Sequence, residues 1–413
     1  MNMRTRSLLI ILGILSLVQP FSAEAKSKHW VGTWGTAPQL VEPNNMPPKP
    51  GLSNRALRQV FRVSIGGEAI RLKLSNEYSD SSITIKAATI ALSTGGSQID
   101  EKSMRPLTFN KSKNISIKAN GAIFSDPIDF KISPRCEVAV TLYFEETPKR
   151  LTGHPGSRTT SYIAENNHPE QAEFSNAVKT DHWYVINRLD VLASKKSASV
   201  AILGNSITDG RGSTTNAQNR WPDILSERLL NNPSTNNVGV LNMGIGGNCM
   251  LNGGLGPTGL KRFQSDVLDQ PGIKWAIIYL GVNDLGGVRN EASAKRTANN
   301  LIEAYKKCID LLKKKKIGVY GATIMPFKGN GYYNVSSESA RKTVNDWIRS
   351  SQMFDAVIDF DLVLQDPSDS ISLHSDFDFQ NDFLHPSPQG HALMGQFVDL
   401  KLFQPKKKRF FIF

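Results

Sequence analysis

After about residue 194 of this 413-residue chain, short apolar runs alternate with amphipathic stretches, and this alternation limits the fold more than any other feature. The apolar runs cover residues 199–203, 238–241, 275–280, 317–323 and 356–359. Between them, apolar side chains recur at helical spacing. These are Trp221, Ile224, Leu225 and Leu229, and then Leu301, Ile302, Tyr305, Ile309 and Leu312. Strand–helix–strand order predicts an α/β fold with a parallel sheet covered by helices on both faces.

The preceding part of the chain has a different pattern, in which apolar and polar residues alternate one by one. Ile70, Leu72 and Leu74 alternate with charged residues, and a similar alternation runs over 137–144. A period of two indicates strands with one buried face. Turn formers such as Gly66-Gly67 separate these runs, and no stretch has a convincing helical pattern. We therefore expect an antiparallel β-sandwich-like domain over 26–193, followed by an α/β domain over 194–405.

The first residues have the pattern of an export signal. Arg4 and Arg6 precede an apolar run over 8–18, and Ala23-Glu24-Ala25 fits a cleavage site. A buried hydrophobic helix is the alternative, but the run is shorter than the roughly 20 residues of a membrane span. We expect a signal peptide over 1–25 and an exported protein, periplasmic or secreted, with no integral membrane segment after signal removal. Residues 406–413 form a basic and aromatic tail.

Charge and cysteine content narrow the classes of partner. The net charge is +12, from 49 basic and 37 acidic residues. An excess of this kind could favour acidic polysaccharide or an anionic surface, although the basic residues are scattered as on solvated faces. No nucleic-acid-binding module is evident. Cys136, Cys249 and Cys308 are too few for a disulfide scaffold, and no residues have metal-site spacing, so we expect no metal and no cofactor.

Ser206 and a distant Asp-x-x-His pair are the candidate nucleophile and its base. Ser206 follows the strand expected at 199–203 and precedes a glycine-containing turn, so we expect its hydroxyl at the sheet edge and outside a helix. Asp382 and His385 lie just before a helix that Pro388 could open. A carboxylate this close can fix the imidazole tautomer and leave the other ring nitrogen for Ser206. Taken singly, these segments could equally be a strand-ending turn and a helix-entry loop.

Two further segments supply donors for oxyanion charge. Gly247 can present its backbone amide without obstruction by a side chain, and Asn283 can present its side-chain amide. The Ser206 amide would be a third donor. Each of these positions follows an expected strand, and the carboxyl ends of parallel strands meet at one edge of the sheet. The combination predicts a serine esterase site.

These segments together resemble the SGNH, or GDSL, hydrolases, over about residues 195–402. The Gly281-Val282-Asn283-Asp284 and Asp382-Phe383-Leu384-His385-Pro386 blocks carry the resemblance most specifically. It implies a three-layer, flavodoxin-like α/β fold, with Ser206 as nucleophile, His385 as general base and acid, and Asp382 orienting His385. It also implies an oxyanion hole formed by Ser206, Gly247 and Asn283. Residues 30–34 and 153–157 look like the β domain of some secreted members.

One departure from that family is Asn205, because the usual motif is Gly-Asp-Ser and this chain has Gly204-Asn205-Ser206. If the usual carboxylate only accepts local hydrogen bonds, an amide oxygen can replace it; if the charge is required, activity would be weak. We also consider His154 and Asn248 as candidate substrate-binding residues. His154 sits in a Gly/Pro/Ser loop and Asn248 follows Gly247. An ordinary loop residue is the alternative for His154.

The expected function is that of an exported serine esterase that removes small acyl groups, foremost acetyl, from carbohydrate or related esters through an acyl-enzyme. Its substrate would be a small-molecule or polysaccharide ester, with no nucleic-acid partner. A lipase or long-chain acylhydrolase is the nearest alternative. A non-catalytic glycan-binding protein with a degenerate site is another, since Asn205 replaces the usual aspartate. A nucleotide-binding protein is disfavoured because the glycines after the first strand form no phosphate-binding fingerprint.

Overall fold

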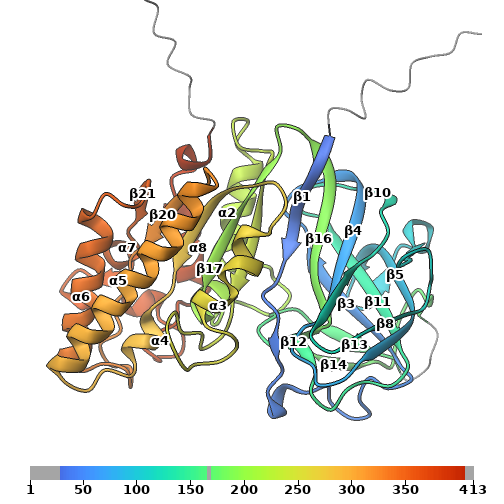
Figure 1. Cartoon of the computed structure of the whole chain (residues 1–413), viewed down its shortest axis with the longest axis horizontal. Coiled ribbons are helices and arrows are strands. Elements are labelled where there is room, and N and C mark those ends of the chain that lie inside the picture. The colour runs from blue at the N-terminus through green and yellow to red at the C-terminus, as the bar shows by residue number, and fades with distance from the viewer. Residues whose placement is uncertain (1–27, 165–168, 405–413) are drawn as a thin grey trace, which may run out of the picture.

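The computed structural model describes residues 28–164 and 169–404 and divides them into a β-rich N-terminal half and an α/β C-terminal half (Figure 1). The expected signal peptide at 1–25 and tail at 406–413 lie outside the described residues. Among the helices that are described, none is both long enough and apolar enough to cross a membrane. The chain passes from one half to the other between β16 (Ile186–Ser194) and β17 (Ala198–Gly204).

The N-terminal half consists of antiparallel sheets, which confirms the prediction from its period-two pattern. One sheet has the order β1-β16-β4-β10, with β9 also paired to β4, and the other has the order β14-β13-β3-β11-β5-β6, with β7 and β8 also paired to β5. A small sheet, β15-β12-β2, lies beside them. The bounds are β1 Lys28–Gly35, β2 Gln39–Leu40, β3 Ala56–Arg62, β4 Gly67–Asn76, β5 Ile83–Gly95, β6 Gln98–Ile99, β7 Arg105–Pro106, β8 Ile115–Ile117, β9 Gly121–Phe124, β10 Ile128–Ile132, β11 Glu137–Phe144, β12 Thr152–His154, β13 Ser161–Ile163, β14 Val178–Thr180 and β15 Trp183–Tyr184. Two single-turn 3-10 helices, η2 (Pro43–Asn45) and η3 (Glu101–Ser103), connect strands.

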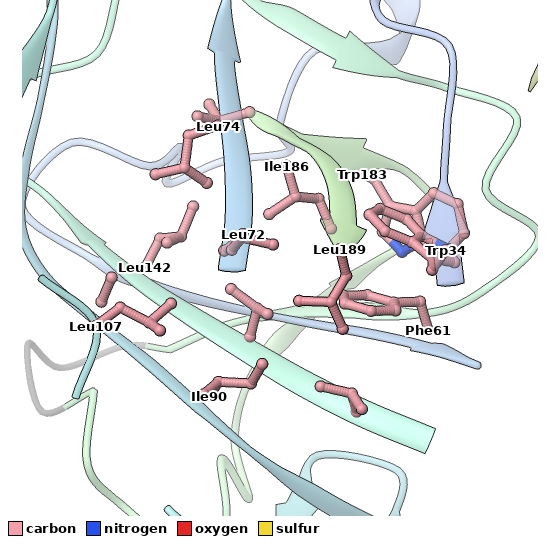
Figure 2. Packing of buried hydrophobic residues seen from close by; sticks show 14 of the residues in the cluster. Trp34, Phe61, Leu72, Leu74, Ile90, Leu107, Leu142, Trp183, Ile186 and Leu189 are labelled. Atoms are coloured by element: carbon pink, nitrogen blue, oxygen red, sulfur yellow. The ribbon is translucent and has the colours of Figure 1, made fainter. Parts of the chain in front are cut away.

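The two larger sheets enclose one hydrophobic core (Figure 2). Leu72 and Leu74 of β4 point into it from one sheet, and Ile90 of β5 and Leu142 of β11 contribute from the other. Trp34 stacks on Phe61 with ring centroids 3.9 Å apart and meets Trp183 edge-on at 5.0 Å. Burial of aromatic rings contributes heavily to such a core, so this cluster anchors β1 and β3 together.

The C-terminal half contains the predicted parallel sheet, in the order β18-β17-β19-β20-β21. The strands are β18 (Val238–Gly244), β17, β19 (Ile273–Tyr279), β20 (Gly318–Ala322) and β21 (Ala356–Ile358), close to the predicted runs. All four pairings are parallel. The order is that of flavodoxin-like folds.

Helices cover both faces of this sheet, as the alternation predicts. Along β17, Val200 and Ile202 contact one helical layer, and Ala201 and Leu203 contact the other. The first layer contains α2, α7 and α8, and the second contains α3, α5 and α6. The helix bounds are α1 Ser206–Asp209, α2 Trp221–Leu230, α3 Gly259–Phe263, continued as a π-helix over Gln264–Leu268, α4 Val282–Leu285, α5 Glu291–Lys314, α6 Val335–Ser350, α7 Phe360–Leu364 and α8 Pro388–Phe397. A hairpin, β22 (Gln365–Asp366) and β23 (Asp369–Leu373), and two 3-10 helices, η5 (Ser375–Phe377) and η6 (Leu400–Phe403), complete the described elements.

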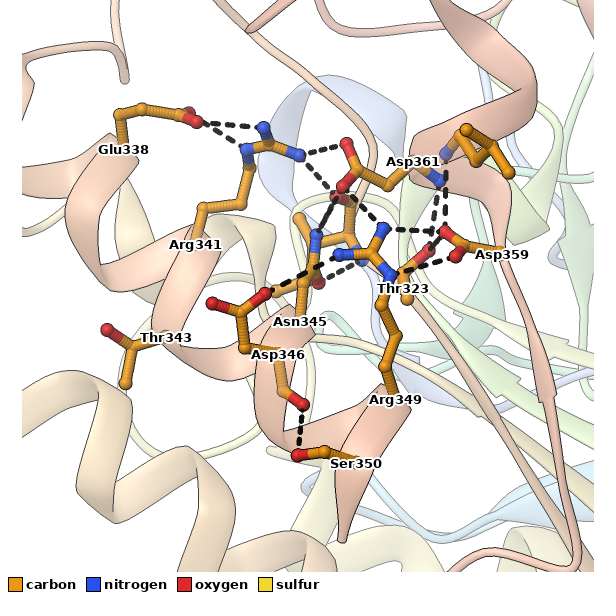
Figure 3. Close-up of polar contacts among 12 residues, drawn as sticks. Thr323, Glu338, Arg341, Thr343, Asn345, Asp346, Arg349, Ser350, Asp359 and Asp361 are labelled. Carbon is orange, nitrogen blue, oxygen red and sulfur yellow. Dashed lines mark hydrogen bonds and ion pairs between the residues drawn. The ribbon is translucent and has the colours of Figure 1, made fainter. Parts of the chain in front are cut away.

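A polar network fixes α6 against the ends of β20 and β21 (Figure 3). Arg341 pairs with Glu338 on its own helix and with Asp361 on α7. Arg349, in the last turn of α6, pairs with Asp359 and Asp361 through hydrogen bonds of 2.7 to 2.8 Å. Buried or half-buried charges are tolerated when they are paired in this way. The network sets the position of α6.

The two halves make direct polar contacts across β1 and β18. The Gly32 N–H donates to the Pro271 carbonyl oxygen at 3.0 Å, and the Val240 N–H donates to the Ser64 hydroxyl at 3.1 Å. These bonds join a strand of each half to a residue of the other half, so the N-terminal half has a defined position beside the parallel sheet.

Candidate active site

The strand order places three predicted site segments at one edge of the parallel sheet. β17 lies between β18 and β19, so successive connections leave it in opposite directions. Ligand sites of open α/β sheets lie at such a switch point, outside the carboxyl ends of the strands. Ser206 follows β17, Gly247 follows β18 and Asn283 follows β19.

Ser206 is the first residue of α1, a single helical turn, which differs from the expectation that the serine lies outside a helix. Asn205 caps this turn, because its side-chain oxygen accepts the Ile207 N–H at 3.0 Å. Gly210, at φ 113°, ends it. Asn is as good an N-cap as Asp, so the amide oxygen at 205 makes the local hydrogen bond that a carboxylate would make. The strand-to-helix turn leaves Ser206 only 7 % exposed but on the wall of a cavity.

Ser206, His385 and Asp382 form a continuous hydrogen-bonded array. The Ser206 Oγ lies 2.8 Å from His385 Nε2, and His385 Nδ1 lies 2.7 Å from Asp382 Oδ2. The other Asp382 oxygen accepts the backbone N–H groups of Leu384 and His385 at 2.9 and 2.8 Å. Burial alone would raise the pKa of Asp382, but the hydrogen bonds from His385 and the two amides outweigh burial and lower it. Asp382 therefore stays ionised and can orient the imidazole.

The loop that carries this pair is held in an unusual conformation. Phe383, between Asp382 and Leu384, has a φ of 58°, which is uncommon for a bulky residue. The Asn330 side chain donates to the Asp382 carbonyl oxygen at 2.7 Å. The Phe379 N–H donates to the His385 carbonyl oxygen at 2.9 Å. Such strain persists where the surroundings determine the conformation, and here they fix the direction of the imidazole.

Three N–H donors remain available beside the Ser206 hydroxyl. Within the part of the chain that the structure describes, the backbone N–H groups of Ser206 and Gly247 donate no hydrogen bond. Gly247 has a φ of 65°, a left-handed conformation that a glycine adopts without strain. One proton of the Asn283 amide is used by the Asn248 carbonyl oxygen at 2.9 Å, which leaves the second. Unpaired donors of this kind can stabilise an oxyanion.

The surroundings of Asn283 fix its amide. Its Oδ1 accepts from the Tyr332 hydroxyl at 3.3 Å, so its NH2 group is the side that turns toward Asn248. Asp284, the next residue, accepts the N–H groups of Met250 and Leu251 at 2.8 and 2.9 Å. Burial raises the pKa of Asp284 to about 6, although these two amides act in the opposite direction. Asp284 thus holds the loop that follows Gly247, a role that the adjacency of Asn283 and Asp284 could have indicated.

A cavity of about 350 Å³ opens over Ser206 and His385, and both halves of the chain line it. The C-terminal half contributes the site residues with Arg211, Leu255 and Tyr332. The N-terminal half contributes Gln39, Glu42, Asn45, Pro155, Gly156, Arg158 and His182. Sequence reasoning missed these N-terminal residues, because their place in the site depends on how the two halves pack. The volume lies within the usual range of about 300 to 1,000 Å³ for small-molecule sites.

The structure places the two predicted substrate-binding residues inside the protein and away from the cavity wall. His154 is 3 % exposed, and its ring nitrogens bond the Ala37 carbonyl oxygen at 2.9 Å and Asp209 Oδ1 at 2.8 Å. Asn248 is fully buried, with its NH2 group donating to Leu255 and Pro257 carbonyl oxygens. Neither side chain has a free group for a substrate. His154 joins the two halves, and Asn248 positions Asn283.

Within residues 28–164 and 169–404, no cluster of His, Cys, Asp and Glu is arranged to hold a metal ion. The three cysteines are unpaired, and Cys249, two residues after Gly247, is a buried filler with 5 % exposure. The site as described is built from side chains and backbone amides.

Comparison with known protein families gives a match in the C-terminal half of the chain. The model of the GDSL-like lipase/acylhydrolase family matches residues 202–393. No curated protein sequence gives a significant match.

Among solved structures, a GDSL-like lipase from Bacteroides thetaiotaomicron is 19 % identical, with 51 % of this chain and 90 % of that chain covered and a TM-score of 0.37. A carbohydrate esterase family 2 enzyme with a carbohydrate-binding domain, from Corynascus thermopiles (Myceliophthora fergusii), is 12 % identical over 91 % of this chain and 98 % of that chain, with a TM-score of 0.37. An acetyl xylan esterase is 19 % identical over 48 % and 96 %, with a TM-score of 0.35. The similarity to the GDSL-like lipase/acylhydrolase family thus covers residues 202–393, a little under half of the chain.

Proposed function

We propose that this chain is an exported serine esterase that hydrolyses small acyl esters, foremost acetyl esters, of carbohydrates or related compounds. The observation that carries the proposal is the hydrogen-bonded array of Ser206, His385 and Asp382 beside three donors that are still free. A degenerate binding site would not need to retain all of these groups. The array therefore supports catalysis over the alternative of a glycan-binding protein without activity.

The proposed reaction has two acyl-transfer steps. His385 Nε2 takes the proton of the Ser206 hydroxyl, and the oxygen attacks the ester carbonyl carbon. The amides of Ser206 and Gly247 and the Asn283 side chain receive the oxyanion. When the intermediate collapses, His385 gives the proton to the departing alcohol and the acyl group stays on Ser206. Water, deprotonated by His385, then releases the acid and restores the serine.

The chemistry of the cavity wall supports a polar alcohol. The side chains of Gln39, Asn45 and His182 offer hydrogen-bonding groups close to the site, as hydroxyl-rich substrates require. A cavity of this size accepts a small acyl group and one sugar-sized alcohol.

One observation favours the long-chain acylhydrolase as a second candidate. A more open groove of about 560 Å³ adjoins the cavity and shares Glu42 and Leu255 with it. Leu40, Val41, Pro43 and Pro257 give this groove an apolar wall that suits an acyl chain. Rates on p-nitrophenyl esters from acetate to decanoate discriminate the two candidates. A maximum at acetate supports the proposal, and a maximum at eight or more carbons supports the second candidate.

The activity itself is tested by Ser206→Ala. We expect hydrolysis of p-nitrophenyl acetate to be lost in this variant and retained in Ser339→Ala, a control serine exposed on α6. A fluorophosphonate probe should label the wild type and leave Ser206→Ala unlabelled. Undiminished turnover by Ser206→Ala would defeat the proposal.

Export is part of the proposal and rests on the pattern of Arg4, Arg6 and the following apolar run. N-terminal sequencing of the protein recovered outside the cytoplasm checks it. We expect the mature chain to start near Lys26. Recovery only from the cytoplasm, with residues 1–25 still attached, would contradict export.

A further inference from the structure

We propose that Arg158 and Arg211 form an anion-binding subsite in the catalytic cavity, and that this subsite receives a carboxylate on the alcohol part of the ester. The substrate class is then an acylated acidic carbohydrate, with the carboxylate of a uronic acid as the recognised group. The inference rests on the proposed esterase function. It is carried by two guanidinium groups, one from each half of the chain, that line the same cavity without an acidic partner.

The backbone at Arg158 is fixed by the opposite half of the molecule. The Asn216 N–H donates to the Arg158 carbonyl oxygen at 3.0 Å, and the Asn216 side chain accepts the Thr160 N–H at 2.8 Å. Arg158 itself has a φ of 51°, an uncommon conformation for a residue with a side chain. An observed outlier of this kind at a cavity wall indicates a position set by its surroundings. The backbone from which the Arg158 side chain extends is therefore held in place.

The Arg158 guanidinium has no partner among the residues that the structure describes. Its Nε is buried without a hydrogen bond, although the side chain as a whole is only half-buried. Arginines that are buried elsewhere do have hydrogen-bond or ion-pair partners. Arg58 bonds the Thr141 hydroxyl and several carbonyl oxygens. The carboxylate-paired ones are Arg188 with Asp190, Arg220 with Asp223, Arg262 with Asp266, and Arg341 with Glu338 and Asp361. The contrast is informative, because buried charges are ordinarily paired.

Arg211 lies on the side of the cavity that carries the base. Its N–H donates to the Ser206 carbonyl oxygen at 2.8 Å, and its carbonyl oxygen accepts from His391 Nε2 at 3.0 Å. Its guanidinium lies 5.9 Å from the ring centre of Phe379, whose N–H bonds the His385 carbonyl oxygen. Because His385 must protonate the departing alcohol, a group held near this loop belongs to the alcohol and not to the acyl group.

The acidic residues of the cavity bond other groups and form no ion pair with the two arginines. The Glu42 oxygens accept from Gln39 Nε2 at 2.5 Å and from Asn45 Nδ2 at 3.0 Å. Asp209 is bound by His154 and lies behind Gly156, within the protein. Over the described ranges, neither Arg158 nor Arg211 has an ion pair with a carboxylate. The cavity therefore keeps two positive groups for a ligand.

The geometry of a guanidinium suits a carboxylate. Its planar group presents parallel N–H donors that match the two oxygens, and such charge-assisted pairs are stronger than neutral hydrogen bonds. A carbohydrate that carries both an esterified hydroxyl and a carboxylate meets the requirement, and the acyl transfer at Ser206 is unchanged by it.

The test compares two acetylated polymers, polygalacturonate as the acidic substrate and glucomannan as the neutral one. The quantity measured is the kcat/KM for acetate release from the acidic polymer divided by that from the neutral polymer. In the wild type we expect a ratio of about ten or more, which should fall as salt is added because the contact is ionic. In Arg158→Gln and in Arg211→Gln we expect the ratio to fall toward one, by about tenfold, near the lower end of the range for one charge-assisted hydrogen bond. Since each ratio is measured within one preparation, partial misfolding cancels.

Two further variants sharpen the test. Arg158→Lys keeps the charge and loses the planar group, so its ratio should lie between those of the wild type and Arg158→Gln. Arg296→Gln removes an exposed arginine of α5 and should leave the ratio unchanged.

A wild-type ratio near one, or a ratio unaffected in both glutamine variants, would overturn the carboxylate subsite. Stronger preference for an acetylated sugar phosphate over the uronate would overturn the choice of carboxylate. Failure of the esterase proposal would look different, because the wild type would then release no acetate from either polymer, or hydrolysis would persist in Ser206→Ala.

Discussion

Asn205 keeps the structural role that an aspartate would have at this position, but it carries no charge. In the family motif this place is usually an aspartate. Here the amide oxygen caps the helical turn that begins at Ser206, through a hydrogen bond of 3.0 Å to the Ile207 N–H. The residue is 1 % exposed, so its role is internal to the protein. The cap, and with it the position of the Ser206 hydroxyl, requires an acceptor and not a negative charge.

Asn205→Asp should therefore change stability and activity little, whereas Asn205→Ala should lower the stability. Loss of the cap is expected to lower the free energy of unfolding by about 1 kcal/mol, whereas Asp and Asn are equivalent caps. Urea unfolding and hydrolysis of p-nitrophenyl acetate measure the two effects. An increase in kcat of tenfold or more in Asn205→Asp would contradict this account and assign a catalytic role to the charge.

Asn283→Ala tests the oxyanion hole at a residue whose orientation is fixed by Tyr332 and Asn248. Removing one donor should lower kcat by about 100- to 1000-fold while KM changes little, because the donor acts mainly in the transition state. Steady-state kinetics on p-nitrophenyl acetate measure both constants. Asn300→Ala, an exposed position of α5, is the matched control. A decrease confined to substrate binding would exclude Asn283 as an oxyanion donor.

At the scale of elements, His391 of α8 connects the turn that follows α1 to the start of α2. This residue is fully buried, its Nε2–H donates to the Arg211 carbonyl oxygen at 3.0 Å, and its Nδ1 accepts the Trp221 N–H at 3.3 Å. The second contact requires the neutral ring, because Nδ1 can accept a hydrogen bond only when it carries no proton. Burial lowers the pKa of His391 to about 4, against an ordinary value of 6.5.

This shift predicts a pH dependence of stability. A histidine whose pKa is lower in the folded state contributes stability that is complete above the unfolded value, about 6.5, and is lost as the pH falls toward 4. The wild type should lose up to about 1.4 kcal/mol per pH unit more than His391→Gln across this window. Chemical denaturation from pH 7 to 4 measures the difference. Parallel curves for the two proteins would contradict it.

The elements differ in how much the sequence could predict. The five parallel strands were predictable because both of their faces are buried, which produces continuous apolar runs, and α5 was predictable from its helical periodicity. The turn at Ser206 was not, because four residues are too short for a periodicity and the turn is set by the Asn205 cap and Gly210. The contact between Ser206 and His385 was predictable from two motifs, one directly after β17 and the other in the loop before α8. The burial of His154 was not, since its partner lies in the other half.

For the whole molecule, the main feature is a cavity made jointly by two halves. His154 of β12 and Asp209 of α1 join the halves directly behind Ser206. Gly156 lies against the same carboxylate, and a Cβ there would stand only 1.8 Å from Asp209 Oδ2. Arg158 and His182 enter the cavity from this side. Residues of this kind could not be assigned from sequence, because they share no motif with the catalytic blocks.

Gly156→Ala should push the two halves apart at this point. Overpacking in a tight interior costs about 1 to 3 kcal/mol, and here the displaced group is the turn that bears Ser206. We expect a lower melting temperature and a lower kcat together. Gly331→Ala, where a Cβ would meet nothing within 4 Å, is the matched control and should change neither. Wild-type kinetics in Gly156→Ala would show that Asp209 moves freely and does not position the nucleophile.

The pairing of β1 with β16 has a consequence for engineering. Lys28 lies opposite Ser194, so the chain enters and leaves the β-rich half at neighbouring points. The β-rich half can therefore be replaced by that of a related protein without changing the connections of the parallel sheet that carries Ser206. The cleavage of the ester bond would then depend on the retained α/β half, and the preference for one alcohol over another would depend on the β-rich half that replaces the original.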